Sequence, residues 1–263
     1  AKKVAVGRDI RLSGPELSRA LIAGLLDMGA DVLDLGVCGT EEIYHAAFSL
    51  EGEGVDGGII VTASHNPADY NGMKFVTRGA RPVTGESGLL QMAERICRGI
   101  LPAPVDSRGR QGERSLKADY VRHLLGAIDP GVLQPLKIVV NSGNGCAGAV
   151  IDLLAPRLPF EFVRLHHQPD GTFPHGVPNP LLPECRAETA RLVVESGADL
   201  GIAWDGDFDR CFFFDEQGGF IEGYYIVGFL AQALLPRHPG AAIIHDPRLT
   251  WNTIEVVKAA GGV

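Results

Sequence analysis

Cysteine is scarce in this sequence, and long apolar runs are missing from it. The five cysteines are odd in number, widely spaced and without a C-x-x-C motif, which argues against a disulfide framework and against structural zinc. A reducing cytoplasm is the simplest location for such a chain. No apolar run approaches the ~18 residues that a membrane span needs, and the first apolar residues read as a strand rather than as a signal peptide.

An excess of basic residues is also missing. The 263 residues carry 24 Lys and Arg against 32 Asp and Glu, for a net charge of −8. Nucleic-acid binding requires basic patches, so we expect no nucleic-acid partner. The lack of a long apolar run leads us to expect no membrane partner. A chain that is 45% apolar and 21% charged is typical of a globular protein, with room for one large or two ordinary domains.

Strand-like and helix-like runs alternate along the chain. The expected strands lie at residues 3–7, 31–36, 57–62, 136–140, 160–165, 199–203 and 241–245, with a short one after Gly219. The expected helices lie at residues 15–28, 41–50, 86–99, 116–127, 147–156, 184–196, 224–235 and 250–260. This alternation predicts an α/β protein, with tandem domains whose mixed, mainly parallel sheets are covered by helices.

A short internal similarity links the two halves of the chain. Residues 54–59 match residues 197–202 at four of six positions, and each copy leads through an apolar strand into a polar loop. If the domains are duplicated, both loops leave the carboxyl ends of strands, where open α/β sheets bind ligands. Chance similarity is the alternative.

The first of these loops contains a candidate nucleophile, Ser64, within Thr-Ala-Ser-His-Asn-Pro at residues 62–67. It follows an apolar run and ends in Asn-Pro, which favours a turn. His65 is not expected to activate Ser64 directly, because adjacent residues of a strand point in opposite directions, and no G-x-S-x-G elbow is present. The alternative is a serine that only caps the turn.

The second loop, residues 205–210, places Asp205, Asp207 and Asp209 at alternate positions. Such a group of carboxylates suits a magnesium-like ion. A calcium EF-hand is a weaker alternative, because Arg210 stands where its turn needs glycine, and an acidic surface turn without an ion is another. A serine that can carry phosphate and a divalent cation together predict phosphoryl transfer.

Three basic residues could support such a site. Lys74, ten residues after Ser64, could stabilise transferring phosphoryl oxygens or act in acid–base catalysis, unless it is a solvated strand lysine. Arg8 and Arg11 follow the first strand and are suited to phosphate, although an Arg8–Asp9 salt bridge is equally compatible with the sequence.

A rival interpretation comes from Gly-Asn-Gly-Cys-Ala-Gly at residues 143–148, which matches the G-x-G-x-x-G dinucleotide fingerprint between a strand and a helix. An NAD(P)-linked enzyme would need Asp or Glu after the next strand. That strand instead ends in Arg164-Leu165-His166-His167. This weakens the alternative without removing it, and we favour a glycine-rich turn.

Taken together, these motifs resemble the α-D-phosphohexomutase family. Residues 62–67 are similar to its phosphoserine loop, residues 141–145 to the opening of its second domain, and residues 205–210 to its magnesium loop, with Phe208 where many members have glycine. Residues 39–44, 178–185 and 220–225 resemble the bacterial phosphomannomutase subgroup.

The resemblance implies a protein of four domains, of which this chain holds residues 1–131 as the first, 132–219 as the second and 220–263 as the start of the third. We therefore expect the missing C-terminal domains of the same protein as its partners. The chain also begins without Met and stops after a helix, which indicates a piece of a longer protein.

The resemblance further implies interconversion of mannose 6-phosphate and mannose 1-phosphate through phosphorylated Ser64 and a bisphosphorylated sugar, supplying nucleotide-sugar synthesis. Glucose phosphates are alternative substrates. Mg2+ would be held by phosphorylated Ser64, Asp205, Asp207 and Asp209. The remaining implied site residues are His65 and Lys74 for catalysis, and Arg8, Arg11, Asn66 and Arg210 for contact with phosphate or substrate.

Overall fold

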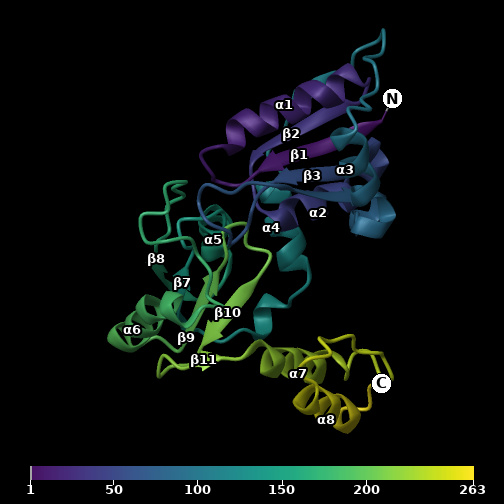
Figure 1. Ribbon diagram of the computed structural model, residues 1–263. Helices are drawn as coiled ribbons and strands as arrows, with labels where there is room; N and C mark the ends of the chain where they lie inside the picture. Colours follow the sequence, from purple (N-terminus) through teal and green to yellow (C-terminus); the bar gives the residue numbers. More distant parts are fainter. Residues whose placement is uncertain (1) are drawn as a thin grey trace.

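The computed structural model describes residues 2–263, which form two mixed β-sheets with helices packed against them and a separate C-terminal pair of helices (Figure 1). The strands of the first sheet are β1 (Lys3–Arg8), β2 (Asp31–Val37), β3 (Val55–Val61), β4 (Met73–Thr77), β5 (Arg81–Pro82) and β6 (Gln111–Glu113). Those of the second are β7 (Lys137–Asn141), β8 (Glu161–Leu165), β9 (Leu200–Trp204), β10 (Cys211–Phe214) and β11 (Phe220–Ile221). The α-helices are α1 (Gly14–Asp27), α2 (Thr40–Ser49), α3 (Leu90–Cys97), α4 (Lys117–Gly126), α5 (Ala147–Leu154), α6 (Ala187–Ser196), α7 (Gly223–Leu234) and α8 (Trp251–Ala259).

Helices cover both faces of the first sheet. Ala5 and Val6 are successive residues of β1, so their side chains point to opposite faces. Val6 packs against Ile22 of α1, whereas Ala5 belongs to the cluster that contains Ile43 of α2. The central strands are therefore buried on both sides, which explains why they read as continuous apolar runs.

The two sheets share one strand order. The order β4-β3-β1-β2 in the first sheet recurs as β10-β9-β7-β8 in the second, with parallel pairs at the centre and an antiparallel strand beside β3 and β9. The similar hexapeptides lead into the equivalent strands. Asp56 accepts a hydrogen bond from the backbone N–H of Lys3, and Asp199 accepts one from that of Lys137. This correspondence supports duplication over chance similarity.

Three expectations about single elements are wrong. Residues 241–245 form no strand. Their backbone exchanges two hydrogen bonds with Val263, Ala241 also donates one to His238, and neither described sheet includes this segment. The helix expected at 86–99 is shortened to α3, since residues 85–89 form a separate turn with Gly88 at φ 152°. The helix expected from residue 184 begins at Ala187, after a 3-10 turn at Pro183–Cys185.

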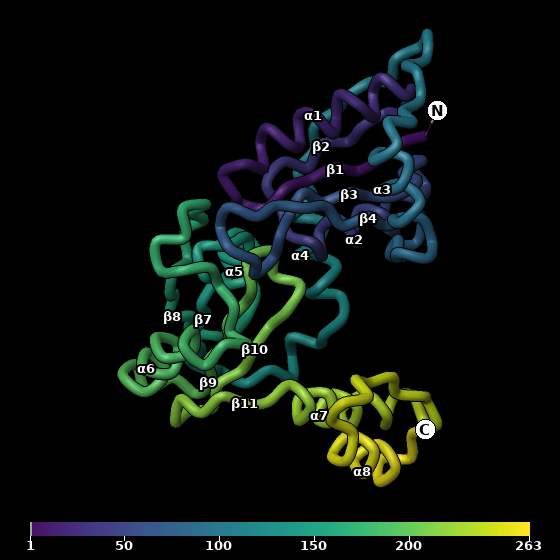
Figure 2. The backbone as a smooth tube through the Cα atoms, viewed as in Figure 1, coloured from purple at the N-terminus to yellow at the C-terminus, as the bar shows by residue number. Residues whose placement is uncertain are grey.

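The last part of the chain lies away from both sheets (Figure 2). Helices α7 and α8 pack against each other through Ala231 and Val257, together with Leu235, which directly follows α7. The expected domain boundaries at residues 131 and 219 stay predictions. Among residues 2–263, no helix combines the length and apolar character that crossing a membrane requires.

The pairing of β3 with β4 can be tested with two glycines. A Cβ at Gly57 would lie 2.4 Å from the Val76 carbonyl oxygen, so Gly57→Ala is expected to lower the free energy of unfolding by about 1–3 kcal/mol. Gly24 in α1 has open space around it, and Gly24→Ala is expected to raise that free energy by about 0.5–1 kcal/mol. Urea denaturation measures both. Equal stability of Gly57→Ala and the unsubstituted protein would contradict this strand pairing.

Candidate active site

The loop that follows β3 and the loop that follows β9 meet between the two sheets. Ser64 Oγ donates a hydrogen bond of 2.6 Å to Asp205 Oδ2, although the two residues lie 141 positions apart in the chain. Both side chains are buried. The structure thus brings the serine and the acidic loop into one site, at the carboxyl ends of equivalent strands.

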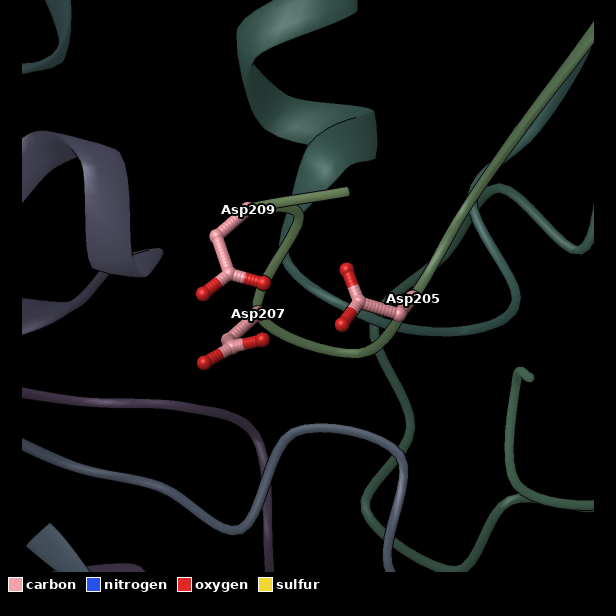
Figure 3. A group of neighbouring side chains, drawn as sticks. All are labelled: Asp205, Asp207 and Asp209. Atoms are coloured by element: carbon pink, nitrogen blue, oxygen red, sulfur yellow. The ribbon is translucent and has the colours of Figure 1, made fainter. Parts of the chain in front are cut away.

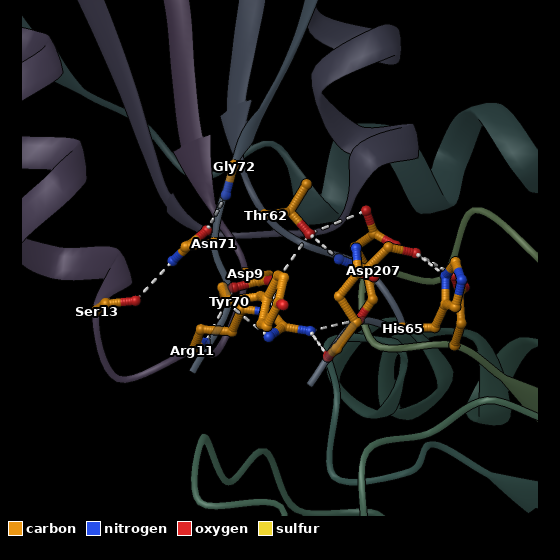
Figure 4. A network of polar contacts seen from close by, with 12 residues as sticks. Asp9, Arg11, Ser13, Thr62, His65, Tyr70, Asn71, Gly72 and Asp207 are labelled. Atoms are coloured by element: carbon orange, nitrogen blue, oxygen red, sulfur yellow. Dashed lines mark hydrogen bonds and ion pairs between the residues drawn. The ribbon is translucent and has the colours of Figure 1, made fainter. Parts of the chain in front are cut away.

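The Arg11 side chain donates hydrogen bonds to the serine loop, the segment of residues 62–71 that follows β3 (Figure 4). Its guanidinium donates hydrogen bonds to the carbonyl oxygens of Pro67 at 2.5 Å, Tyr70 at 2.9 Å, Ser64 at 2.9 Å and residue 66 at 2.6 Å. It also pairs with Asp9 Oδ2 at 3.3 Å, and its side chain is fully buried. Arg11 therefore positions the loop and has no exposed surface for the substrate contact that the sequence suggested.

The backbone turns sharply at Ser64, which has a φ of 53°. This left-handed conformation is uncommon for residues other than glycine and ends the alternation of side chains along β3. As a result, His65 Nδ1 lies 3.3 Å from Ser64 Oγ. The expectation that His65 points away from Ser64 is wrong, because it assumed an extended backbone at this position.

Asp205, Asp207 and Asp209 point toward a common space (Figure 3). Each offers a carboxylate oxygen, and these oxygens all lie within 4.8 Å of one another. Asp205 and Asp207 are buried, while Asp209 is partly exposed. Within residues 2–263, this is the acidic cluster with the spacing of a metal site.

Asp207 is held through one of its two carboxylate oxygens. Its Oδ2 accepts hydrogen bonds from Thr40 Oγ1 at 2.6 Å and Lys74 Nζ at 2.6 Å, and Thr62 Oγ1 lies 3.1 Å away. Its Oδ1 is buried without a hydrogen-bond partner among the described protein atoms. A buried carboxylate oxygen normally has a partner, so this atom suits a cation. The donor set, entirely oxygen, fits Mg2+.

Lys74 and Arg210 supply the positive charge around the cluster. Lys74 Nζ lies 2.6 Å from both Asp207 Oδ2 and Asp209 Oδ2. Arg210 Nη2 donates to Ser64 Oγ at 2.5 Å and also contacts Asp205 and the His65 ring. Two cations thus face three carboxylates, which leaves the site with excess negative charge.

This charge distribution shifts several pKa values. Burial and the Asp207 carboxylate raise the pKa of Asp205 to about 6. Burial alone would lower the pKa of Lys74, but Asp207 and Asp209 outweigh it and raise that pKa. Burial, together with the charge of Arg210, lowers the pKa of His65. Near neutral pH, His65 is therefore an uncharged acceptor and Lys74 is a cation.

A pocket of about 490 Å3 opens beside Ser64, and its lining includes His65, Lys74 and Arg210. This volume is in the usual range for small-molecule sites. Asn66 lies exposed at its rim. Arg8 instead lines a separate pocket against α1, so the structure does not bring it to the serine.

The glycine-rich segment at residues 143–148 packs against the chain itself. A Cβ at Gly145 would lie 2.5 Å from the Gly206 carbonyl oxygen, and one at Gly148 would lie 2.2 Å from the His167 oxygen. The Cys146 N–H donates to Gly206 at 3.0 Å. In the dinucleotide fingerprint, the second glycine and the N–H groups at the start of the helix, here Gly145 and the Cys146 N–H, face a pyrophosphate. The NAD(P) alternative therefore loses its structural support.

Thr40, Thr62 and Asp9 belong to the site but were not among the predicted site residues. Thr62 Oγ1 lies 2.7 Å from Asp9 Oδ2 and accepts a hydrogen bond from the Ser64 N–H at 2.9 Å. Thr62 begins the same hexapeptide that contains Ser64, so its position was the available signal. Nothing in the local sequence indicates that Thr40 reaches a residue 167 positions away.

Two family descriptions match most of the chain. "Phosphoglucomutase/phosphomannomutase, alpha/beta/alpha domain I" matches residues 1–96, and domain II of the same family matches residues 118–219. The chain belongs to the phosphoglucomutase/phosphomannomutase family. This confirms the resemblance and the α/β fold that the sequence predicted.

Curated relatives agree with this assignment. The chain is 59% identical to a phosphomannomutase of Salmonella montevideo and 57% identical to one of Escherichia coli K12, in each case over 99% of this chain and 58% of the relative. The crystal structure of a family protein from Burkholderia thailandensis superposes with a TM-score of 0.90 at 36% identity, covering 100% of this chain and 57% of the other. The chain thus spans just under three fifths of these proteins.

Arg11→Lys tests the support of the serine loop. Lysine lacks the planar fork of donors, and each buried carbonyl left without a donor costs about 1–3 kcal/mol. We expect faster amide hydrogen exchange across residues 64–71 and a lower melting temperature. Arg114→Lys, at an exposed pair with Glu53, is the control and is expected to change stability by less than about 0.5 kcal/mol. Unchanged exchange in Arg11→Lys would contradict this role.

Asp205→Asn tests the charge at the acidic cluster. The pKa of Asp205 is higher in the folded protein than its usual value of 3.8, so the carboxyl group favours the folded state at low pH and loses this contribution as pH rises through about 6. Asp205→Asn is therefore expected to raise the melting temperature in EDTA near neutral pH, but not near pH 4, and to abolish stabilisation by Mg2+. A lower melting temperature at neutral pH would contradict this expectation.

Proposed function

We propose that the protein carrying this chain is a phosphohexomutase that interconverts mannose 6-phosphate and mannose 1-phosphate. The observation that carries the proposal is the 2.6 Å contact between Ser64 Oγ and Asp205 in a cluster of three carboxylates. Membership of the phosphoglucomutase/phosphomannomutase family supports the interpretation of this contact as a site of phosphoryl transfer. The names of the curated relatives favour mannose phosphates, while the family description also includes glucose phosphates.

The proposed reaction uses phosphorylated Ser64 as donor. The bond between phosphorus and Ser64 Oγ breaks as a bond from phosphorus to a sugar hydroxyl oxygen forms. The hydroxyl proton passes to a base, and Ser64 Oγ takes up a proton. The bisphosphorylated sugar then turns around and returns its other phosphoryl group to Ser64, which regenerates the enzyme. Because phosphoryl transfer needs mainly positioning and charge stabilisation, the rigid support of Ser64 favours this chemistry.

Asp205, Asp207 and Asp209, with the serine phosphate, are the residues that would hold Mg2+. The ion would supply neutralisation of phosphoryl charge. Arg210 is placed to contact the oxygens on Ser64 and Lys74 those near Asp209. His65, with its lowered pKa, can accept the proton of the sugar hydroxyl, and Lys74 can donate one.

The proposal extends to the whole protein. The additional length of the relatives leaves room for C-terminal domains that complete sugar recognition. All five cysteines are free thiols, which is compatible with the proposed cytoplasmic location. The product would feed a reaction that attaches a sugar 1-phosphate to a nucleotide.

Ser64→Ala in the full-length protein is the direct test. We expect mutase activity to fall by about three orders of magnitude or more, because removal of the nucleophile removes the covalent route. Intact-mass analysis is expected to find one phosphoryl group on the unsubstituted protein and none on this variant. The exposed Ser49→Ala is the matched control. Full activity in Ser64→Ala would overturn the mechanism, and faster turnover of glucose phosphates would overturn the choice of sugar.

A further inference from the structure

Phe208 lies in an unusual conformation between two residues of the acidic cluster. Its φ is 46°, a left-handed value that favours glycine, because a Cβ crowds the backbone there. The side chain is 8% exposed. A phenylalanine at such a position is expected to make a contact that glycine cannot make, because that contact offsets the backbone strain.

The contact lies at the start of α2. A Cβ on Gly39 would lie 2.2 Å from Phe208 Cε1, 2.5 Å from Cδ1 and 2.6 Å from Cζ. Gly39 has φ −94° and ψ 172°, which any residue can adopt. The backbone therefore does not require glycine at position 39. The ring of Phe208 requires it, because that ring fills the space that a side chain would take.

The ring also joins elements from both sides of the site. It packs in a cluster with Tyr120 of α4 and with Cys146 and Ala147 at the start of α5. The Tyr120 and Phe208 ring centroids are 6.3 Å apart. The ring thus fills the space between the acidic loop, α4 and the start of α5.

The residues next to this pair make the polar contacts of the site. Thr40, beside Gly39, donates its N–H to the Asp207 carbonyl oxygen at 3.0 Å and its hydroxyl to Asp207 Oδ2 at 2.6 Å. Phe208 follows Asp207 directly. Two neighbouring contacts, one polar and one apolar, therefore fix the acidic loop on the start of α2. The hydrogen bonds set the distance, and the ring opposes rotation about them.

We infer that Phe208 and Gly39 form a ring-and-gap pair that positions the Asp207 carboxylate for the cation. The inference rests on the proposed function, because it assumes that the acidic cluster holds a divalent metal. The Phe208 ring packs on Gly39, Tyr120 and the start of α5 and offers no ligand atom, so Phe208 is a positioning residue that acts through Asp207. A ring that only filled the core would affect stability without selectively affecting the metal.

The test uses Phe208→Ala, Gly39→Ala and the double variant in the full-length protein. Alanine removes the ring but keeps a Cβ at the left-handed position, so it isolates the ring from the backbone effect. The readouts are the Mn2+ dissociation constant, measured by electron paramagnetic resonance of free Mn2+, the melting temperature in EDTA, and the KM for sugar phosphate. Gly52→Ala, at an exposed glycine with open space around it, is the control for Gly39→Ala.

We expect each single variant to weaken Mn2+ binding about 10-fold, as loss of support behind a metal ligand does, with KM for the sugar phosphate changed by less than about twofold. In the Phe208→Ala background, Gly39→Ala is expected to cause no further loss, because the ring that it would strike is gone. Gly52→Ala is expected to match the unsubstituted protein. Phe208→Leu provides a milder variant if Phe208→Ala fails to fold, with a loss of Mn2+ affinity in the same direction.

An equal loss of affinity from Gly39→Ala in both backgrounds would overturn the pair. Unchanged Mn2+ affinity in both single variants, with only the melting temperature lowered, would reduce Phe208 to a packing residue. Asp207→Asn separates these outcomes from failure of the metal site itself. If that variant binds Mn2+ as tightly as the unsubstituted protein, the proposed site is wrong and the inference falls with it.

Discussion

The site depends on keeping three carboxylates close together in a mostly buried place. Asp205, Asp207 and Asp209 repel one another, and the repulsion is strong where water is excluded. Arg210 and Lys74 offset part of this charge. Burial and the remaining repulsion from Asp207 raise the pKa of Asp205, and a divalent cation would relieve that repulsion. The clustering of these carboxylates therefore lowers the stability of the metal-free protein, a cost that is common where a candidate functional site concentrates charge.

The duplicated topology provides the geometry for this cluster. In each sheet, one strand (β3 or β9) has an antiparallel neighbour on one side. A polar loop leaves the carboxyl end of that strand. The sheet edges from which these loops leave face each other, so Ser64 of one copy contacts Asp205 of the other. Neither loop would form the site alone. The candidate site therefore lies between the two copies rather than within either one.

The sequence was informative where structure is determined locally. Strands such as β1 and β9 and helices such as α1 carry their own hydrophobic pattern, so their positions could be predicted to within a few residues. The short β5 and β6 carry no such pattern and form only by pairing with β4 and β2. Residues 241–245 show the opposite case, an apolar run that lacks a sheet to join.

The same distinction applies to the site. Ser64 and the three aspartates lie in compact motifs and could be named from sequence. The support of these residues depends on contacts between distant segments, so Thr40 was missed and Arg11 was expected to meet substrate rather than the loop. His65 was expected to point away because the amino-acid pattern does not indicate that Ser64 adopts a left-handed backbone conformation.

The hydrogen bonding of Arg11 has a consequence for the outer side of the serine loop. Carbonyl groups of the loop, including those of Ser64 and Tyr70, point inward to the guanidinium. In a trans peptide the N–H points opposite to the carbonyl, and the described residues contain no cis bond. The N–H groups of His65 and Asn71 are therefore turned outward. One buried arginine thus aligns several peptide dipoles, whose positive ends give this surface an intrinsic attraction for anions.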